Sequence, residues 1–203
     1  MKKYLLLLVV AFTVLASCAK SSPTPGDDNN NNPPAGQIDE KLLGVWKKSS
    51  LEKYTSGGYT GGYFWQEYRF KANGTYQYLV KVFSVFSSDI FFLYESGTWS
   101  VNGSQLTITP AKGKDQAWSK SSSGATSEWG SLTTNSSREL EKITYTYGWK
   151  FWEGTGTTDL QLHYARETVR DGTFSDATTQ QWYYQSFTNT YPSYMTLPPG
   201  FEW

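Results

Sequence analysis

A strict alternation of apolar and polar residues is the feature that most constrains what this chain can fold into. In residues 74–83, GTYQYLVKVF, Tyr76 lies on one side of an extended chain and Gln77 lies on the other. Residues 142–151 and 159–165 repeat the pattern with aromatic and branched side chains. Because the side chains of a strand point alternately to opposite faces, this period of two predicts half-buried antiparallel strands. No segment keeps a helical period, so we expect an all-β domain.

Asparagine–glycine pairs mark the turns between these strands. Asn102-Gly103 and Asn73-Gly74 each separate two alternating runs, and this dipeptide adopts the positive backbone angles of a type I′ hairpin turn. We expect about eight strands, at residues 43–53, 63–71, 74–83, 91–101, 104–109, 140–152, 158–168 and 180–188. Consecutive hairpins predict a single antiparallel up-and-down β-barrel, with a two-sheet β-sandwich as the alternative.

The start of the chain carries a secretion signal. Lys2 and Lys3 precede an apolar run of about 11 to 13 residues. This run is shorter than the roughly 20 residues that a membrane-spanning helix needs. Small residues then lead to Cys18, the only cysteine of the chain, which therefore has no partner for an internal disulfide. The pattern predicts a signal peptide at residues 1–17.

The stretch Leu-Ala-Ser-Cys at residues 15–18 resembles the lipobox of bacterial lipoproteins. The resemblance implies that the thiol of Cys18 takes a diacylglyceryl group, that the chain is cut before it, and that the new amine is acylated, for example by palmitate. Several acyl chains on one residue hold a protein on a membrane, because each buried methylene contributes about 0.8 kcal/mol. We expect a lipid-anchored protein of the bacterial cell envelope, in the outer membrane, with the periplasmic and surface faces both left open.

The residues after Cys18 divide into a linker and one domain. Residues 18–36 are rich in proline, asparagine, serine and glycine, which predicts a disordered linker. Residues 37–203 are long enough for one domain with a sizeable core. Without Lys2 and Lys3, the 18 basic residues fall to 16 against 18 acidic ones, a net charge of −2. This balance argues against nucleic acid as a partner, and we expect a monomer.

Three segments resemble the lipocalin-like domains of bacterial lipoproteins. LLGVWK at residues 42–47 contains the Gly-x-Trp opening of that family, here Gly44 and Trp46. SGTWSVNGSQLTI at residues 96–108 resembles a mid-barrel hairpin, and YRFKANGTYQY lies between the two. The resemblance implies that Trp46 closes the floor of a barrel. It also implies that an arginine from a late strand stacks on this tryptophan, for which Arg166 is the candidate.

The resemblance thins after about residue 110. Residues 111–140 are rich in serine, glycine and threonine and are far longer than a hairpin loop. Loops longer than about 15 residues are uncommon unless they are functional or disordered. Trp118 and Trp129 lie within this stretch, so we expect a partly packed flap over one end of the barrel.

An eight-stranded barrel has room for side chains or for one small ligand. The lipocalin-like resemblance therefore implies a binding protein for a small apolar or amphipathic molecule. The residues that we expect to line its pocket are Tyr76, Tyr78, Tyr145, Tyr147 and Trp149, whose hydroxyl and N–H groups would orient the ligand. In the alternative interpretation these rings fill the barrel and leave no cavity.

A second hypothesis places binding on the rim of the barrel. A filled barrel could still present aromatic rings that stack on a glycan or anchor a partner protein. The rings expected outside the strands or near their ends are those of Tyr54, Tyr59, Tyr63, Phe64, Trp65, Trp118, Trp129 and Trp203.

The sequence offers little for an enzyme. His163 is the only histidine, and with no spare cysteine the usual ligands of a zinc site are missing. We expect no catalytic residues, no metal and no cofactor. A pair of carboxylates drawn from Glu67, Glu95, Glu141 and Glu153 is the one arrangement that could still support catalysis.

Overall fold

The computed structural model describes residues 36–122, 124–125, 127–164, 167–171, 180–185 and 195–202. The expected signal peptide, Cys18 and nearly all of the expected linker lie outside the described residues, as do Arg166 and Trp203. Within the described part, no helix is long and apolar enough to cross a membrane.

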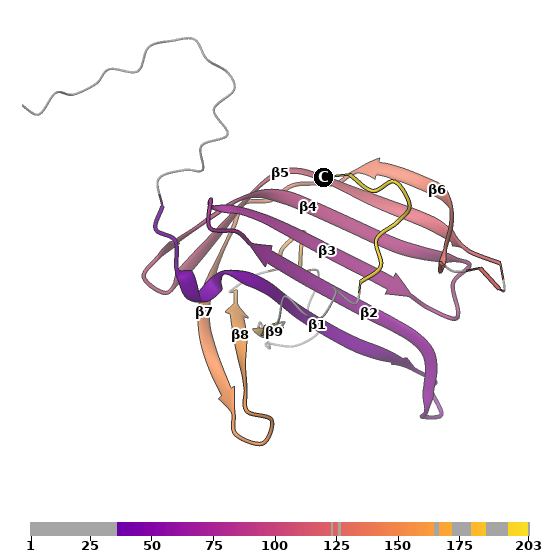
Figure 1. Ribbon diagram of the computed structural model, residues 1–203, viewed down its shortest axis with the longest axis horizontal. Helices are drawn as coiled ribbons and strands as arrows, with labels where there is room; N and C mark the ends of the chain where they lie inside the picture. The colour runs from indigo at the N-terminus through magenta and orange to yellow at the C-terminus, as the bar shows by residue number, and fades with distance from the viewer. Residues whose placement is uncertain are drawn as a thin grey trace, which may run out of the picture. The chain divides into compact units, whose positions relative to one another are not determined.

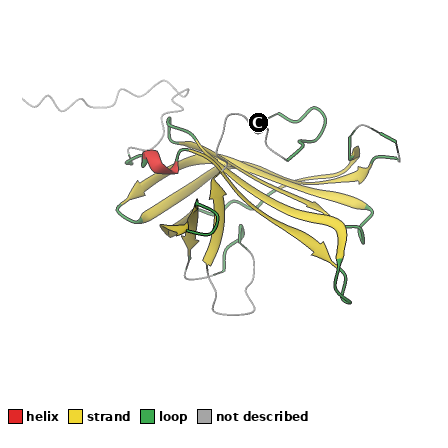
Figure 2. Ribbon diagram, turned by 60° about the horizontal axis from the view of Figure 1, so that its bottom comes forward, coloured by secondary structure: helices red, strands yellow, loops and turns green. Residues whose placement is uncertain are grey.

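The described domain is built almost wholly from strands, as the alternation predicted. Its elements are one helical turn, η1 (Glu40–Leu42), and the strands β1 (Gly44–Lys53), β2 (Tyr59–Phe70), β3 (Thr75–Phe83), β4 (Asp89–Asn102), β5 (Gln105–Lys120), β6 (Trp129–Ser137), β7 (Ile143–Trp152), β8 (Thr157–His163) and β9 (Gln180–Gln185). Figure 2 shows the single helical turn against strands and loops. The two asparagine–glycine pairs do form hairpin turns, with φ angles of 74° at Gly74 and 58° at Gly103.

All nine strands join one antiparallel sheet. Their order is β4-β3-β2-β1-β9-β8-β7-β5-β6, and β4 also pairs with β5. Eight strands therefore follow one another around a circuit, while β6 extends the sheet beyond β5. Two junctions are short, because β1 meets β9 through two residue pairs and β5 meets β7 through four. The sheet is a single, incompletely closed barrel wall and not a two-sheet sandwich.

The expected flap at residues 111–140 is wrong. The second half of β5 continues the pairing with β4, and β6 pairs with β5 in turn. Figure 1 shows β5 running beside β4 for most of its length, with β6 along its outer side. The alternation of apolar and polar residues did not reveal these strands, because the side chains of the segment are small or polar. In addition, β-bulges near Trp118 shift the period of two. Backbone pairing with β4 holds the segment in place instead.

The inner face of the wall carries the main core. Trp46, Tyr68, Phe70, Tyr76, Tyr78 and Trp99 are at most 3% exposed and pack together with aliphatic residues of β5 and β8. Phe70 lies 5.1 Å from Trp99 and 5.5 Å from Tyr68 between ring centroids. We call these six residues the aromatic floor.

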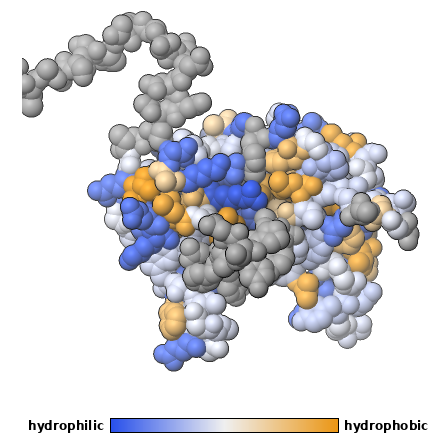
Figure 3. Space-filling model, viewed as in Figure 1, coloured by the Kyte–Doolittle hydropathy of each residue, from blue (hydrophilic) through white to orange (hydrophobic). Residues whose placement is uncertain are grey.

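The outer face carries a second apolar cluster. Leu79, Ile90 and Phe92 alternate with inward residues of β3 and β4, yet all three are fully buried. Trp129 and the C-terminal residues Met195, Leu197 and Phe201 cover them. Figure 3 shows hydrophobic residues gathered around this C-terminal segment on the face that it crosses. Both faces of β3 and β4 are therefore buried.

Lys81 ties the C-terminal segment to this outer face. The sequence pattern placed it on the polar side of β3, but its side chain is fully buried. Its ammonium group pairs with Glu128, donates to the hydroxyl of Thr196 at 2.6 Å and lies 4.4 Å from the ring centroid of Trp129. Burial lowers the pKa of Lys81, and the carboxylate of Glu128 opposes that shift.

The outer cluster can be tested with one buried and one exposed phenylalanine. Phe92 makes edge contacts with Trp129 and Phe201, whereas Phe151 on the β7–β8 hairpin is 61% exposed. We expect Phe92→Ala to lower the free energy of unfolding by about 3–5 kcal/mol. The matched change Phe151→Ala should alter it by less than about 0.5 kcal/mol. Urea unfolding followed by circular dichroism measures both, and equal effects would contradict the second core.

Candidate functional site

The inner face of the wall changes character along the strands. Above the aromatic floor, direct cross-strand pairing places Lys48 beside Gln66, then Val80, Leu93 and Asp115. One step further, it places Ser50 beside Phe64, then Val82, Phe91 and Ala117. We call the second set the open row. The region between floor and open row, which holds Lys48, Gln66, Glu95, Asp115, Arg138, Arg170 and Asp171, is the polar layer.

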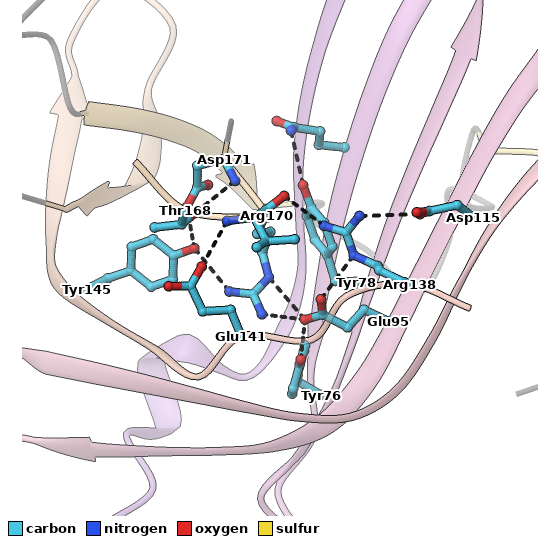
Figure 4. A network of polar contacts seen from close by, with 12 residues as sticks. Tyr76, Tyr78, Glu95, Asp115, Arg138, Glu141, Tyr145, Thr168, Arg170 and Asp171 are labelled. Carbon is cyan, nitrogen blue, oxygen red and sulfur yellow. Dashed lines mark hydrogen bonds and ion pairs between the residues drawn. The ribbon is translucent and has the colours of Figure 1, made fainter. Parts of the chain in front are cut away.

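A buried ion-pair network forms the centre of the polar layer (Figure 4). Arg170 donates to Glu95 through Nη2 and, at 3.0 Å, through Nε, and both side chains are 1% exposed. Arg138 approaches the other oxygen of Glu95 at 3.3 Å. Arg138 also reaches Asp115 at 3.3 Å and donates to the backbone carbonyl of Val169 at 3.1 Å. Arg170 belongs to the turn that follows β8, so the pair joins that turn to β4 across the interior.

Hydroxyl groups complete this network. Tyr76 donates to Glu95, and Tyr145 donates to Asp171 at 2.7 Å while accepting from Arg170 at 3.2 Å. Thr168 also donates to Asp171, at 2.6 Å. Burial raises the pKa of Asp171 despite these hydrogen bonds and the nearby cations.

A second group of hydroxyls lies on the β2 side of the polar layer. The Gln66 amide donates to the hydroxyl of Tyr78 at 3.1 Å, and Tyr183 approaches the Gln66 carbonyl at 3.5 Å. Tyr68 lies in the same cluster, 4.5 Å from Tyr78 and 5.3 Å from Tyr183 between ring centroids. Its hydroxyl is fully buried and has no hydrogen-bond partner among the residues described. Such a group costs about 1–3 kcal/mol when it stays unsatisfied.

Apart from Ser50, the open row is apolar, and it is only partly covered. Phe91 is 41% exposed, and Phe64 and Val82 are half-buried against the edge of the main core. Val80 and Leu93, one step toward the floor, are buried. Beyond Lys47 the described pairing of β1 with β9 ends, so this part of the inner face lies where the wall is not closed.

The residues predicted to line a pocket lie in two different places. Tyr76, Tyr78 and Tyr145 are fully buried, and their hydroxyls are all engaged as described above. Tyr147 and Trp149 are half-buried, and the Tyr147 hydroxyl donates to Asp39 at 2.8 Å. Burial, and after it the hydrogen bond to the Asp39 carboxylate, raises the pKa of Tyr147 to about 12. The structure therefore places three of the predicted residues around the polar layer and two beside η1.

The predicted floor motif occupies the closed end of the wall. Gly44 has a φ of 117°, which an L side chain rarely adopts. Trp46 is 1% exposed, donates through its indole N–H to the Leu42 carbonyl at 2.8 Å and lies 5.3 Å from the ring centroid of Trp149.

The predicted rim residues separate into exposed and buried groups. Tyr54 and Tyr59 are 46% and 63% exposed at the β1–β2 hairpin. Tyr63 and Trp65 stack on each other at 4.5 Å on the outer face. The expectation of exposed rings is wrong for Trp129, which packs in the outer cluster, and Phe64 belongs to the open row.

Exposed apolar residues also gather where two hairpin tips meet. Leu51, Tyr54, Tyr59, Val85 and Phe86 are each more than 40% exposed, and we call this set the lip. The Glu52 carboxylate joins the tips by accepting from Thr60 at 2.6 Å, from Ser84 and from the Val85 amide at 3.0 Å.

The four candidate carboxylates have separate surroundings. Glu67 pairs with Arg69 at 2.5 Å, and Glu95 lies in the ion-pair network. Glu141 accepts from the Val169 amide at 2.8 Å, and Glu153 is exposed in the β7–β8 turn. Among the described residues, no three histidine, cysteine, aspartate or glutamate side chains could hold one metal ion.

Several residues of this region were not identified from the sequence. Phe91 could have been found by extending the β4 alternation, and Tyr68 by extending that of β2, because each strand was predicted. Arg138 and Arg170 carry no such signal, since both lie outside the strands and reach the interior only through the path of the chain. A small pocket of about 90 Å³ that is lined by Lys47, Trp65, Glu67 and Met195, among others, was not foreseen either.

Part of this chain matches a known protein family. Residues 42–129 match the lipocalin-like domain family. The match confirms the resemblance that Gly44, Trp46 and the hairpin at 96–108 indicated. It runs from η1 through the first residue of β6, so the lipocalin-like domain match includes the strands that carry the open row, Glu95 and Asp115. Arg138 and Arg170 lie beyond it. None of the curated proteins matches this chain.

The buried tyrosines make stability depend on alkaline pH. Burial raises the pKa of Tyr68, Tyr76, Tyr78, Tyr145 and Tyr183. A raised folded-state pKa means that the unfolded chain loses these protons first, so stability is complete below about pH 10 and falls as the pH rises further. In an alkaline titration, we expect the buried tyrosines to ionise, as measured by phenolate absorbance, only at the pH at which circular dichroism shows loss of the sheet. Ionisation of all 15 tyrosines in an intact sheet would contradict this.

Proposed function

We propose that this lipocalin-like domain binds a small apolar or amphipathic molecule on the open row. The observation that carries the proposal is the partial exposure of Phe91, with Phe64 and Val82, on an inner face whose floor is filled. A monomeric protein gains stability by burying such a row, and here a ligand tail would do so. Covering apolar area contributes about 25 cal/mol per Å².

The filled floor supports this position for the ligand. Six aromatic residues already occupy the closed end, and two of their hydroxyls, those of Tyr76 and Tyr78, are engaged by Glu95 and Gln66. A ligand tail therefore fits above the polar layer, in contact with Phe91, Val82 and Phe64. The aromatic residues predicted from the sequence then act mainly as the base of the site, not as its lining.

We also propose that the protein is held on the cell envelope by lipid on Cys18. The lipobox-like residues 15–18 and the proline- and asparagine-rich linker support this part of the proposal. At about 5–6 Å times the square root of its length, such a linker keeps the domain some 20–25 Å from the lipid. A site at that distance would serve to bind or carry a sparingly soluble molecule near a membrane.

A second candidate function is capture of a glycan or a partner protein by the lip. Its support is the exposure of Tyr59 and Phe86, which are 63% and 69% exposed at adjoining hairpin tips. Tyr54 and Phe86 lie edge to face at 5.9 Å, and Glu52 keeps the two tips together. Ordered rings of this kind can stack on a sugar or a side chain at little entropic cost.

The two candidates are separated by titrating the mature protein with the uncharged dye N-phenylnaphthylamine. We expect saturable binding, and we expect Phe91→Ser to weaken it about tenfold, because about 1.4 kcal/mol of apolar contact is lost. Phe151→Ser, an equal change on an exposed ring far along the chain, serves as the control and should bind like the wild type. If Phe86→Ser weakens binding and Phe91→Ser does not, the lip is the site.

The lipid anchor predicts a simple difference between two variants. In a bacterial host fed labelled palmitate, the wild type should carry the label and sediment with membranes, since its acyl chains insert there. Cys18→Ala should lose the label and leave the membrane fraction. Ser22→Ala, four residues after Cys18, is the matched control and should behave as the wild type. A Cys18→Ala protein that keeps the label would contradict lipidation at this residue.

A further inference from the structure

The polar layer beneath the open row has its charges matched. Its cations are Lys48, Arg138 and Arg170, and its carboxyl groups are Glu95, Asp115 and Asp171. Arg138 and Arg170 pair with Glu95, Arg138 also pairs with Asp115, and Lys48 interacts with Asp171. Among the described residues, three cations thus face three carboxyl groups, so these six side chains carry no net charge for a ligand to neutralise.

A charged head group would therefore enter this layer at a cost. A carboxylate that approached Arg138 or Arg170 would compete with Glu95 and Asp115, because these two carboxylates already accept hydrogen bonds from the guanidinium groups. A displaced carboxylate would remain half-buried or buried, since Glu95 is 1% and Asp115 31% exposed. An ammonium head would meet the same problem with reversed sign. Unpaired charge in such surroundings is strongly disfavoured.

The aromatic floor beneath this layer contains a hydrogen-bonding group that has no partner among the described residues. The Tyr68 hydroxyl is fully buried and has no partner among the described residues. Burial raises its pKa, so at neutral pH it is an uncharged group that can both donate and accept. Next to it, the contact of Tyr183 with the Gln66 carbonyl is long, at 3.5 Å, which leaves that acceptor open to a better donor.

The β2 strand connects this group to the apolar site. Phe64, Gln66 and Tyr68 alternate along one strand and face the interior, so Tyr68 lies about 13 Å along β2 from Phe64. This length matches that of a medium-length alkyl chain, so a ligand with its tail on the open row would direct its head toward Gln66 and Tyr68.

We infer that the polar layer selects amphipathic ligands whose head group is uncharged and hydrogen-bonding, such as an alcohol, an ester or an amide. Fatty acids and alkylamines of the same chain length bind more weakly. The inference rests on the proposed function, because the tail occupies the open row. It adds the chemical class of the ligand and names Tyr68 and Gln66 as the residues that contact the head.

Competition against N-phenylnaphthylamine on the mature protein tests the preference without any variant. We expect decanol and monodecanoylglycerol to displace the dye at concentrations about tenfold lower than decanoate or decylamine at neutral pH, a difference of about 1.4 kcal/mol. Equal displacement by the acid and the alcohol would overturn the inference while leaving the proposed function in place. Failure of the dye itself to bind would overturn both.

The variant Tyr68→Phe separates a binding role from a structural one. Removal of an unsatisfied buried hydroxyl should leave the unfolding midpoint unchanged or raise it. The affinity for decanol should nevertheless fall several-fold, with no change for the dye, because a head-group hydrogen bond is lost. Tyr94→Phe, which changes a ring on the outer face, is the matched control. A Tyr68→Phe protein that binds decanol as the wild type does would overturn the assignment of Tyr68.

A substitution in the polar layer tests whether the balance of charge excludes charged head groups. Asp115→Asn removes the negative charge that faces Arg138 and leaves the polar layer with one excess positive charge. The Asp115 side chain is 31% exposed, so the domain should tolerate its replacement. We expect decanoate to gain several-fold in affinity relative to decanol. Glu40→Gln, an equal change of charge on exposed η1, should leave the ratio unaltered. An unchanged ratio in Asp115→Asn would show that the balance of charge does not set the preference.

Discussion

The buried pair of Arg170 and Glu95 is the interaction on which the interior of this domain depends. It joins the turn after β8 to the middle of β4, two elements that share no backbone pairing. Tyr76 and Arg138 also donate to Glu95, and Tyr145 accepts from Arg170. Two charges removed from water require this degree of satisfaction, because each one left unpaired would cost several kcal/mol.

The position of this network divides the inner face into regions with different tasks. Below it, aromatic rings pack against one another and leave the closed end filled. Above it, Phe64, Val82 and Phe91 face a part of the wall where the pairing of β1 with β9 has ended. A lipocalin-like wall can thus be filled at one end and offer an apolar surface at the other. This reconciles the two interpretations of the aromatic residues that the sequence left open.

The outer face shows how β3 and β4 bury apolar residues that point away from the main core. Leu79, Ile90 and Phe92 point outward and are covered by Trp129 and by the C-terminal segment. Lys81 holds that cover with an ion pair, a hydrogen bond and a contact with the Trp129 ring. The wall is therefore buried on both faces here, whereas antiparallel sheets commonly leave one face in contact with solvent.

The sequence by itself determined the strand class and much of the strand positions, because alternation and asparagine–glycine turns act over a few residues. It placed Tyr76, Tyr78 and Tyr145 on the inner face and Trp46 at the floor, and its resemblance to a lipocalin-like domain is confirmed for residues 42–129. It missed β6 and the second half of β5, whose serine- and threonine-rich segments are held by backbone pairing and carry little alternation. Only the tertiary structure decided that Arg138, Arg170 and Glu95 meet, that Tyr68 is left without a described partner, and that Lys81 is buried. The reason is physical: local periodicity determines which face a side chain takes, whereas contacts between residues 75 positions apart depend on how the whole wall curves and closes.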